Sequence, residues 1–270
     1  IASVSPKPQT TRTRITGIKT IGETQMVFMD TPGLHKPTTK LSDHMLKAVR
    51  DAVADIDAVL FVQDCTKPLS QQEEELLGSL ERAKTPVILV LNKIDLCSDK
   101  TKLMQAIASL NAAHTFAATV PVSVTENDGV DLVEQEVMAL AQPAPHYFPD
   151  EKFTDQPERV LAAEMIREKI LNLLRDEVPH GIAVSIERMK ERDDKDLLDI
   201  DATIYCERES HKGILIGKHG TMLRKIATLA RKDLERFFYI QVNLQCWVKV
   251  KEDWRNKEGL IHNFGLDNPE

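Results

Sequence analysis

The chain has 270 residues, enough for one large domain or two domains of ordinary size. Hydrophobic residues make up 42% of it and charged residues 29%, which is typical of a globular protein with a buried core. The net charge of −7 excludes binding of polyanions through overall charge, and no apolar run is as long as a membrane span. The four cysteines form no CxxC pair, so they indicate neither a zinc site nor a disulfide framework, and free thiols fit a reducing compartment.

The first half of the chain alternates apolar strands with helices. Strands are expected at 25–30, 58–62, 87–91 and 120–123, and helices at 40–55, 70–83, 99–112 and 129–141. Continuous apolar strands that alternate with helices predict a parallel sheet covered on both faces. Ligands of such sheets bind at the carboxyl ends of the strands.

The second half has a different pattern. Four prolines punctuate residues 143–157, which we interpret as a linker. A helix is expected at 158–177, strands at 181–189 and 199–207, a glycine-bounded loop at 213–220, a helix at 221–238 and a strand at 240–250. With a brief helical turn before the loop, the order is α-β-β-α-α-β. Residues 157–270 are therefore expected to fold without the first half.

The tetrapeptide Asn92-Lys-Ile-Asp95 directly follows an apolar strand. A carboxylate at Asp95 can accept two hydrogen bonds, from the guanine N1–H and the N2 amine, a donor pair that adenine lacks. Asn92 would tie the base edge to neighbouring loops, and the Lys93 stem would pack on the ring. The segment Val122-Ser123-Val124 ends the fourth strand, where its backbone N–H would meet the guanine O6. The alternative for each is an ordinary polar turn after a strand.

A second motif, Asp30-Thr31-Pro32-Gly33, also follows a strand. Asp30 can hold Mg²⁺ through water, and the Gly33 N–H can approach a γ-phosphate because no Cβ intervenes. By itself the motif is more simply a Pro-Gly turn. NKID, however, begins 62 residues later, also at a strand end, and this order and spacing favour a guanine-nucleotide site.

Upstream of the DTPG strand lies a polar segment with two threonines. A hydroxyl there can complete the magnesium shell and sense the γ-phosphate. Thr11 is the favoured residue and Thr10 the second choice, and both are otherwise simple loop threonines. The segment at issue comprises Gln9, Thr10, Thr11 and Arg12.

The sequence Gly217-Lys218-His219-Gly220 is a GxxG loop followed by a helix. Two glycines permit a tight turn and close approach of a nucleic-acid backbone, and Lys218 can neutralise a phosphate. Between residues 208 and 236 there are eight Lys or Arg, among them Arg224 and Lys225, against three acids, a local charge of +5. This clustering favours single-stranded RNA over the alternative, a tight helix–helix turn.

Apolar residues around the loop are assigned as follows. Ile214, Ile216 and Ile226 are expected to line the groove beside the loop, with at least one of them in the core. Trp247 alternates with lysines on a strand, so core burial is expected for it.

The segments PKPQTTR, DTPGLHKP and NKID, with a glycine loop downstream, resemble the Era family of GTPases over essentially the whole chain. The resemblance implies a P-loop-NTPase-like, doubly wound parallel sheet followed by an α+β type II KH domain. It places the GTPase domain at 1–142, the linker at 143–157, and the KH domain with a C-terminal helix at 158–270. Switch I would be 5–14, switch II would be 30–37, and base recognition would fall to Asn92, Lys93 and Asp95.

The resemblance also implies GTP or GDP and Mg²⁺ as cofactors and GTP hydrolysis as the activity. The RNA would be small-subunit ribosomal RNA, the partner the small ribosomal subunit, and the process ribosome assembly. The location would be the cytoplasm, with peripheral contact to the inner face of the cell membrane.

Two departures from the family pattern stand out. Val124 replaces the usual alanine after Ser123, and GxxxxGK[ST] occurs nowhere in the 270 residues. We therefore expect a chain that begins after its phosphate-binding loop and first strand, and GTP hydrolysis by the chain as it stands is left open. One alternative is an RNA-binding KH fragment with a non-functional nucleotide domain. Another, a GTPase whose second domain contacts only protein, is disfavoured by the GKHG loop.

Overall fold

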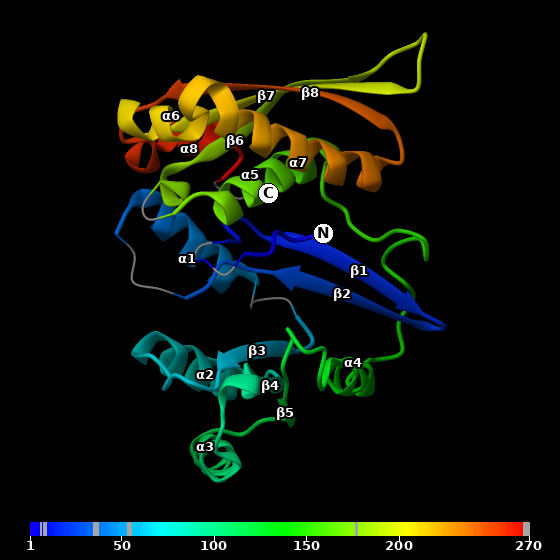
Figure 1. Cartoon of the computed structure of the whole chain (residues 1–270). Helices are drawn as coiled ribbons and strands as arrows, with labels where there is room; N and C mark the ends of the chain where they lie inside the picture. The colour runs from blue at the N-terminus through cyan, green and yellow to red at the C-terminus, as the bar shows by residue number, and fades with distance from the viewer. Residues whose placement is uncertain (6, 8–9, 35–37, 53–55, 176–177, 267–270) are drawn as a thin grey trace. The chain divides into compact units, whose positions relative to one another are not determined.

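The computed structural model describes residues 1–266 except 6, 8–9, 35–37, 53–55 and 176–177. The chain forms two compact units (Figure 1). The smaller unit comprises Ile18–Phe28 and Arg50–Lys152. The larger unit comprises Ile1–Gly17, Met29–Val49 and Phe153–Glu270, so segments from the start of the chain join its second half.

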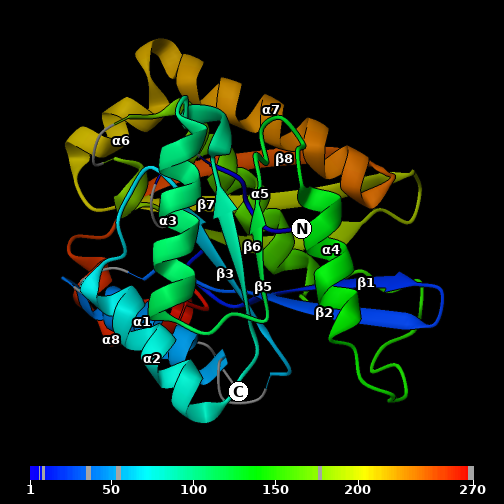
Figure 2. The same ribbon diagram turned by 90° about the horizontal axis from the view of Figure 1, so that it is seen from below.

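The smaller unit contains a parallel sheet made by three of the four predicted strands, whereas the strand predicted at 25–30 is not part of it. Its strands are β3 (Val59–Asp64), β4 (Val87–Asn92) and β5 (Ala118–Pro121), in the order β3-β4-β5. Three α-helices accompany them: α2 (Gln71–Ala83), α3 (Lys100–Ala113) and α4 (Val130–Ala139), beside the strands in Figure 2. A 3₁₀ turn, η1 (Ile94–Leu96), follows β4.

Both faces of the central strand β4 are buried, which explains its unbroken apolar sequence. Val87 and Leu89 pack in one cluster with residues of α2 and with Leu110 of α3. Ile88 and Val90 pack in a second cluster with Val120, Val122 and residues of α4. Alternate side chains of a strand point to opposite faces, so the sheet is covered by helices on both sides, as predicted.

Two further strands form a hairpin. Strand β1 (Ile15–Ile21) pairs with β2 (Thr24–Asp30), and Gly22, with φ 57°, makes the left-handed turn between them. The sequence predicted β2 but not β1, whose polar and apolar residues do not form a continuous apolar run. Helix α1 (Lys40–Ala52) follows.

The second half has the predicted α-β-β-α-α-β order. Its elements are α5 (Glu158–Leu173), β6 (Ala183–Glu191), β7 (Leu197–Cys206), α6 (Glu209–Ile216), α7 (Thr221–Phe238) and β8 (Gln241–Val250). Strand β7 is central, antiparallel to β6 and parallel to β8. Helices α5 and α7 lie on the same side of this sheet (Figure 1) and share its main hydrophobic cluster. The helix predicted at 158–177 is shorter, because Leu174 is already extended.

A second cluster of the larger unit contains two residues from the first half of the chain. Leu41 and Met45 of α1 pack with Ala183, Trp254 and Ile261. Trp254 belongs to the turn η4 (Trp254–Asn256), and Ile261 to helix α8 (Glu258–Asn263). Independent folding of 157–270 stays a prediction, but this cluster is not made by the second half alone.

The burial predicted for Trp247 is wrong. Its residue is 45% exposed, whereas Trp254 is 0% exposed. On β8 the exposed residues alternate with partly buried ones, and Trp247 is in register with Thr203 on the central strand. Period-two alternation places Trp247 on the exposed set of side chains, whereas Cys246 and Val248 pack against the helices.

Candidate functional site

The NKID loop connects β4 to η1 in the smaller unit. Asn92 uses its side-chain oxygen to accept hydrogen bonds from the backbone N–H of Lys93 (2.7 Å) and of Val124 (3.3 Å). Lys93 is left-handed, with φ 68°. Asn92 thus joins the two loops that follow β4 and β5, and its contact with a base edge stays a prediction.

Ser123 and Asp95 lie together at this end of the sheet. The Ser123 hydroxyl donates a hydrogen bond of 2.7 Å to the Asp95 carboxylate, whose residue is otherwise exposed. The backbone N–H of Ser123, predicted to meet a guanine O6, instead donates to the Asp128 carbonyl (3.0 Å). Ser123 therefore orients the acid through its side chain.

Asp64 is a residue of this cluster that sequence reasoning missed. Its carboxylate accepts from Lys93 Nζ at 2.8 Å and from the Thr66 hydroxyl at 2.6 Å. The Lys93 hydrogen bond, followed by that of Thr66, holds the pKa of Asp64 well below its usual range. Asp64 ends β3 in register with Asn92, and the meeting of parallel strand ends at one edge was the signal that pointed to it.

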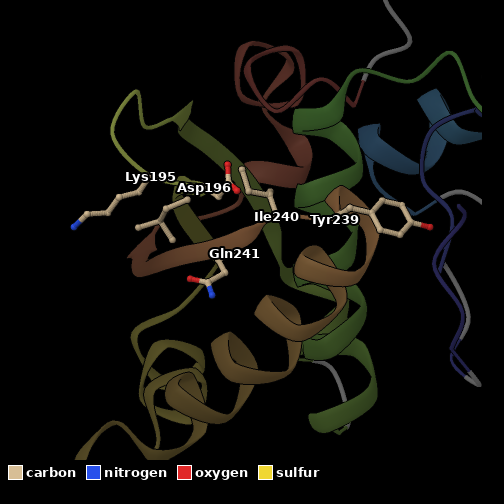
Figure 3. A pocket seen from close by; sticks show the side chains of 6 residues that line it. Lys195, Asp196, Tyr239, Ile240 and Gln241 are labelled. Atoms are coloured by element: carbon tan, nitrogen blue, oxygen red, sulfur yellow. The ribbon is translucent and has the colours of Figure 1, made fainter.

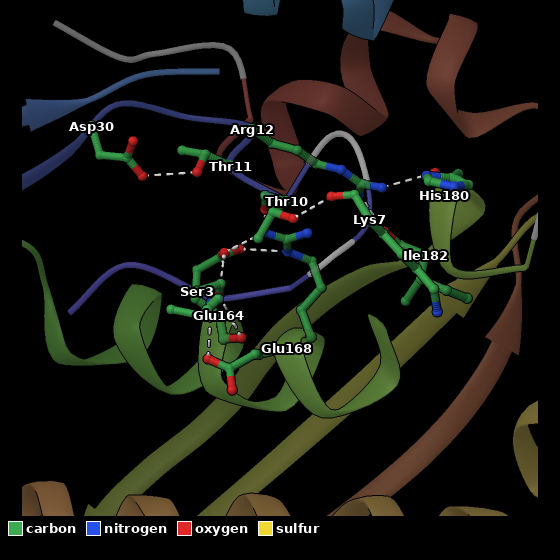
Figure 4. A network of polar contacts seen from close by, with 12 residues as sticks. Ser3, Lys7, Thr10, Thr11, Arg12, Asp30, Glu164, Glu168, His180 and Ile182 are labelled. Atoms are coloured by element: carbon green, nitrogen blue, oxygen red, sulfur yellow. Dashed lines mark hydrogen bonds and ion pairs between the residues drawn. The ribbon is translucent and has the colours of Figure 1, made fainter. Parts of the chain in front are cut away.

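The two predicted magnesium ligands are in contact in the larger unit. The Thr11 hydroxyl donates to the Asp30 carboxylate at 2.8 Å (Figure 4). Thr10 instead donates to the Lys7 carbonyl at 2.7 Å. Partial removal of the carboxylate from water raises the pKa of Asp30, and the Thr11 hydrogen bond opposes that shift. Hydroxyl and carboxylate oxygens suit Mg²⁺.

The remaining residues of these two motifs are placed as follows. Gln9 and residues 35–37 lie outside the described residues. Thr31 is half-buried and Pro32 buried, whereas Gly33 is exposed with no neighbouring atom within 4 Å of where a Cβ would stand. There is thus room for a ligand beside Gly33.

Arg12, next to Thr11, is buried in the larger unit with 2% exposure. Its guanidinium donates to the carbonyls of Ile182 and His180, the latter at 2.8 Å (Figure 4). It also lies 5.8 Å from the centre of the Trp254 ring. Burial, together with the nearby Arg167 charge, lowers the pKa of Arg12.

A buried acid on α5 balances this positive charge. Glu164 accepts from Arg167 and from the Ser3 hydroxyl (3.1 Å), and Arg167 also donates to the Thr10 carbonyl (Figure 4). Burial by itself raises the pKa of Glu164, but the Arg167 charge and hydrogen bond and the Arg12 charge outweigh it, so the pKa is lowered. The segment with the predicted switch I residues is thus hydrogen-bonded to α5 and to the turn η2 (Pro179–Gly181).

The GKHG loop joins α6 to α7. Gly217 has φ 71° and ψ 173°, and a Cβ there would lie 2.8 Å from that of Met222, so only glycine fits. Gly220 has φ 77°, and His219 is also left-handed, with φ 53°. This backbone holds Lys218 and His219 outward, and both are exposed.

The basic residues near the loop differ in their partners. Arg224 and Lys225 are exposed, and in the described part of the chain neither they nor Lys218 forms an ion pair within 4.0 Å. Arg231 and Arg236, further along α7, lie 3.8 and 3.4 Å from acids of the same helix. The isoleucines predicted to line the groove differ in burial, because Ile226 is fully buried whereas Ile214 is 49% exposed.

Comparison with known proteins identifies the family of this chain. A model described as "50S ribosome-binding GTPase" matches residues 1–93, and a KH-domain model matches 177–255. The GTPase Era of Clostridioides difficile (strain 630) is 48% identical over 267 residues, which cover 99% of this chain and 90% of that protein. The chain belongs to the Era GTPase family. The Era protein of Ruminiclostridium cellulolyticum is 46% identical, over 98% of this chain and 88% of its own length.

Solved Era structures show the same fold. A single-residue variant of Aquifex aeolicus Era bound to GDP and AlF₄⁻ superposes with a TM-score of 0.93 at 33% identity. An Era complex with MgGDPNP and nucleotides 1506–1542 of 16S ribosomal RNA has the same TM-score at 34% identity. Each comparison covers 98% of this chain and 90% of the solved one. The fold is therefore Era-like, a P-loop-type α/β GTPase domain followed by a KH domain.

The larger unit of this Era-family chain also has an open pocket of about 520 Å³. Figure 3 shows its lining at the β6–β7 turn and the start of β8: Lys195, Asp196, Leu197, Tyr239, Ile240 and Gln241. The Tyr239 ring extends away from the other labelled side chains. The lining includes no residue that the sequence predicted for nucleotide or RNA. Among the described helices, none is long and apolar enough to cross a membrane.

Proposed function

We propose that this protein is a guanine-nucleotide switch that binds and hydrolyses GTP with Mg²⁺, binds small-subunit ribosomal RNA and acts in assembly of the small ribosomal subunit. Membership of the Era family supports the proposal, as does the Era structure with MgGDPNP and 16S ribosomal RNA. We assign the GTPase domain to residues 1–142 and the KH domain to 158–270.

The residues predicted to bind the nucleotide have suitable chemistry in each unit taken by itself. The Asp95 carboxylate, oriented by Ser123, is exposed and accepts hydrogen bonds, as a guanine edge requires. Thr11 and Asp30 supply oxygen ligands for Mg²⁺, with Asp30 acting through water. The metal, when bound, neutralises charge on the phosphates.

The observation that carries the proposal is the adjacency of Thr11 and Arg12. The Thr11 hydroxyl donates to Asp30, the predicted magnesium ligand. The Arg12 guanidinium donates to the backbone carbonyls of His180 and Ile182, which precede the first strand of the KH sheet. The dipeptide Thr11-Arg12 therefore contacts both a residue predicted to bind the nucleotide and the start of the RNA-binding domain. A change at Thr11 on GTP binding or hydrolysis would reach the KH domain through Arg12.

Replacing Arg12 by Ala is expected to uncouple RNA binding from nucleotide state. In this chain preceded by a GxxxxGK[ST] segment, RNA affinity should differ between GTP-analogue and GDP forms by about 5- to 150-fold, the usual range of such coupling. In the variant the ratio should approach one. RNA titrations with each nucleotide measure it, and Arg192→Ala, which removes a guanidinium that binds Asp199, is the matched control. An unchanged ratio in folded Arg12→Ala protein contradicts the coupling.

Reversing charge in the glycine loop is expected to weaken RNA binding. Lys218→Asp with His219→Asp leaves Gly217 and Gly220 to make the turn, so the fold is retained. Binding of single-stranded RNA should fall by about tenfold or more, and the salt slope should decrease by about 0.7 for each phosphate that is no longer neutralised. Duplex RNA should bind more weakly than single strands, because a KH groove reads splayed bases.

The control for this variant places a slightly larger charge change elsewhere, −4 for two Lys→Asp substitutions against −3 for the loop variant with neutral His219. Lys190→Asp with Lys195→Asp lies toward the β6–β7 turn, at the other end of the sheet from α6 (Figure 1). Salt titrations of the whole chain compare the two, with circular dichroism to verify folding. Equal RNA binding by the loop variant and its parent at every salt concentration would show that GKHG is only a turn.

If the protein instead binds RNA without nucleotide function, its affinity for RNA should be the same in the presence of GTP and of GDP. The nucleotide titration above separates the two.

From the family resemblance we also propose a cytoplasmic protein with peripheral contact to the inner face of the cell membrane, which a vesicle co-sedimentation assay tests.

A further inference from the structure

Two cysteines that are 32 residues apart in sequence meet beside the NKID loop. Cys65 directly follows β3, and Cys97 directly follows η1. Their Sγ atoms lie 2.6 Å apart, and a covalent S–S bond is about 2.05 Å long, so a small approach would bring them to bonding distance. Both residues are half-buried, so small reagents have partial access to them.

The same thiols contact the backbone of the base-recognition loop. The Cys65 thiol is 3.2 Å from the Lys93 carbonyl, and the Cys65 backbone N–H donates to the Asn92 carbonyl at 2.9 Å. Lys93 in turn reaches Asp64, the residue before Cys65, at 2.8 Å. A bond between the two sulfurs would therefore act directly on this loop.

We propose that Cys65 and Cys97 form a dithiol site that low-molecular-weight disulfides oxidise reversibly to an intramolecular disulfide. This site is a redox modification site next to the guanine-recognition loop. The other two cysteines lack this arrangement. Cys206 on β7 is in register with Val250, and Cys246 on β8 with Ala202, so they are four register positions apart.

The chemistry is a two-step exchange. The Cys97 thiolate attacks one sulfur of the small disulfide, forms a mixed disulfide and expels one thiolate. The Cys65 thiolate then attacks the Cys97 sulfur, closes the protein disulfide and expels the second thiolate. Two protein thiol protons pass to the two leaving thiolates, and two electrons pass from the protein to the reagent.

The order of attack follows from the surroundings of Cys65. Burial, and then the neighbouring Cys97 thiol, raise the pKa of Cys65 to about 12. The thiolate is the attacking form, so this shift disfavours a first attack by Cys65. Once Cys97 is in the mixed disulfide, the Cys65 thiol has a reactive sulfur at its side, and proximity drives closure.

Oxidation should also loosen guanine binding, a consequence that rests on the proposed function. The disulfide has no S–H, so the Lys93 carbonyl loses its donor. The disulfide also links Cys97, which follows η1, covalently to Cys65, which follows β3. We expect at least a severalfold weaker affinity for GDP, because the Lys93 carbonyl that loses its donor belongs to the base-recognition loop.

The first test uses the whole chain and glutathione disulfide as the probe. Native protein should fall from four free thiols to two. Its intact mass should lose two hydrogens, and a reductant should reverse the change. Peptide mapping should join the peptides of Cys65 and Cys97. Cys206→Ser, the matched control, should still close the link, whereas Cys65→Ser should stop at a mixed disulfide on Cys97.

Four thiols remaining after excess glutathione disulfide, or a mixed disulfide that never closes in folded parent protein, would overturn the site. The second test compares GDP binding by reduced and oxidised protein that carries an added GxxxxGK[ST] segment. Equal affinities would overturn the effect on the loop. Failure of the reduced protein to bind GDP would instead count against the proposed function and leave the thiol result standing.

Discussion

Replacing Asp95 by Asn should shift the base preference from guanine toward xanthine. In the structure the Ser123 hydroxyl donates to one oxygen of the Asp95 carboxylate. In the variant that hydroxyl can donate only to the amide oxygen, which turns the amide NH₂ toward the base. Guanine then meets a donor where it needs an acceptor, while the C2 carbonyl of xanthine gains a partner. Discrimination of this type reaches an order of 10⁴.

Competition between GDP and xanthosine diphosphate measures the shift, in protein that carries a GxxxxGK[ST] segment before Ile1. Asp99→Asn is the matched control, because Asp99 caps α3 through the backbone N–H groups of Thr101 and Lys102 and should leave base preference unchanged. Equal binding of GDP and ADP by the parent, or guanine preference retained in Asp95→Asn, would refute the assignment of NKID.

Replacing Trp254 by Ala should destabilise the larger unit by about 3–5 kcal/mol, the usual cost of removing a buried large aromatic side chain. Trp254 is 0% exposed, and its ring packs edge-on against Phe264 with centroids 5.3 Å apart. Its indole N–H donates to the Gly181 carbonyl at 2.9 Å, which would lose this partner. Arg12 would also lose the ring beside its guanidinium.

The measurement is a denaturant titration followed by far-ultraviolet circular dichroism. Trp247→Ala is the control, because that ring is 45% exposed and should cost much less, on the order of 1 kcal/mol or below. A loss for Trp247→Ala equal to or larger than that for Trp254→Ala would contradict the assignment of the second cluster. It would also weaken the view that Arg12 is held in place through Trp254.

The sequence alone determined the parts of this protein that depend on local pattern. The run Val87–Leu91 is apolar at every position because both faces of β4 are covered, and such a run can be recognised in the sequence itself. Gly217 and Gly220 were predicted to make a tight loop, and both have the positive φ angles that glycine accepts. Asn92 was likewise assigned from its position after a strand.

The tertiary structure decided what depends on residues far apart in sequence. From the sequence, Arg12 was assigned only to the predicted switch I segment. Its burial depends on segments far along the chain, such as the one that contains Ile182, 170 residues away. The two tryptophans differ in burial because Leu41 and Met45 cover one of them, whereas Trp247 lies on the exposed side of an edge strand. Cys65 and Cys97 meet only because parallel strands bring their carboxyl ends together, and neither cysteine has a local signature that reveals the other.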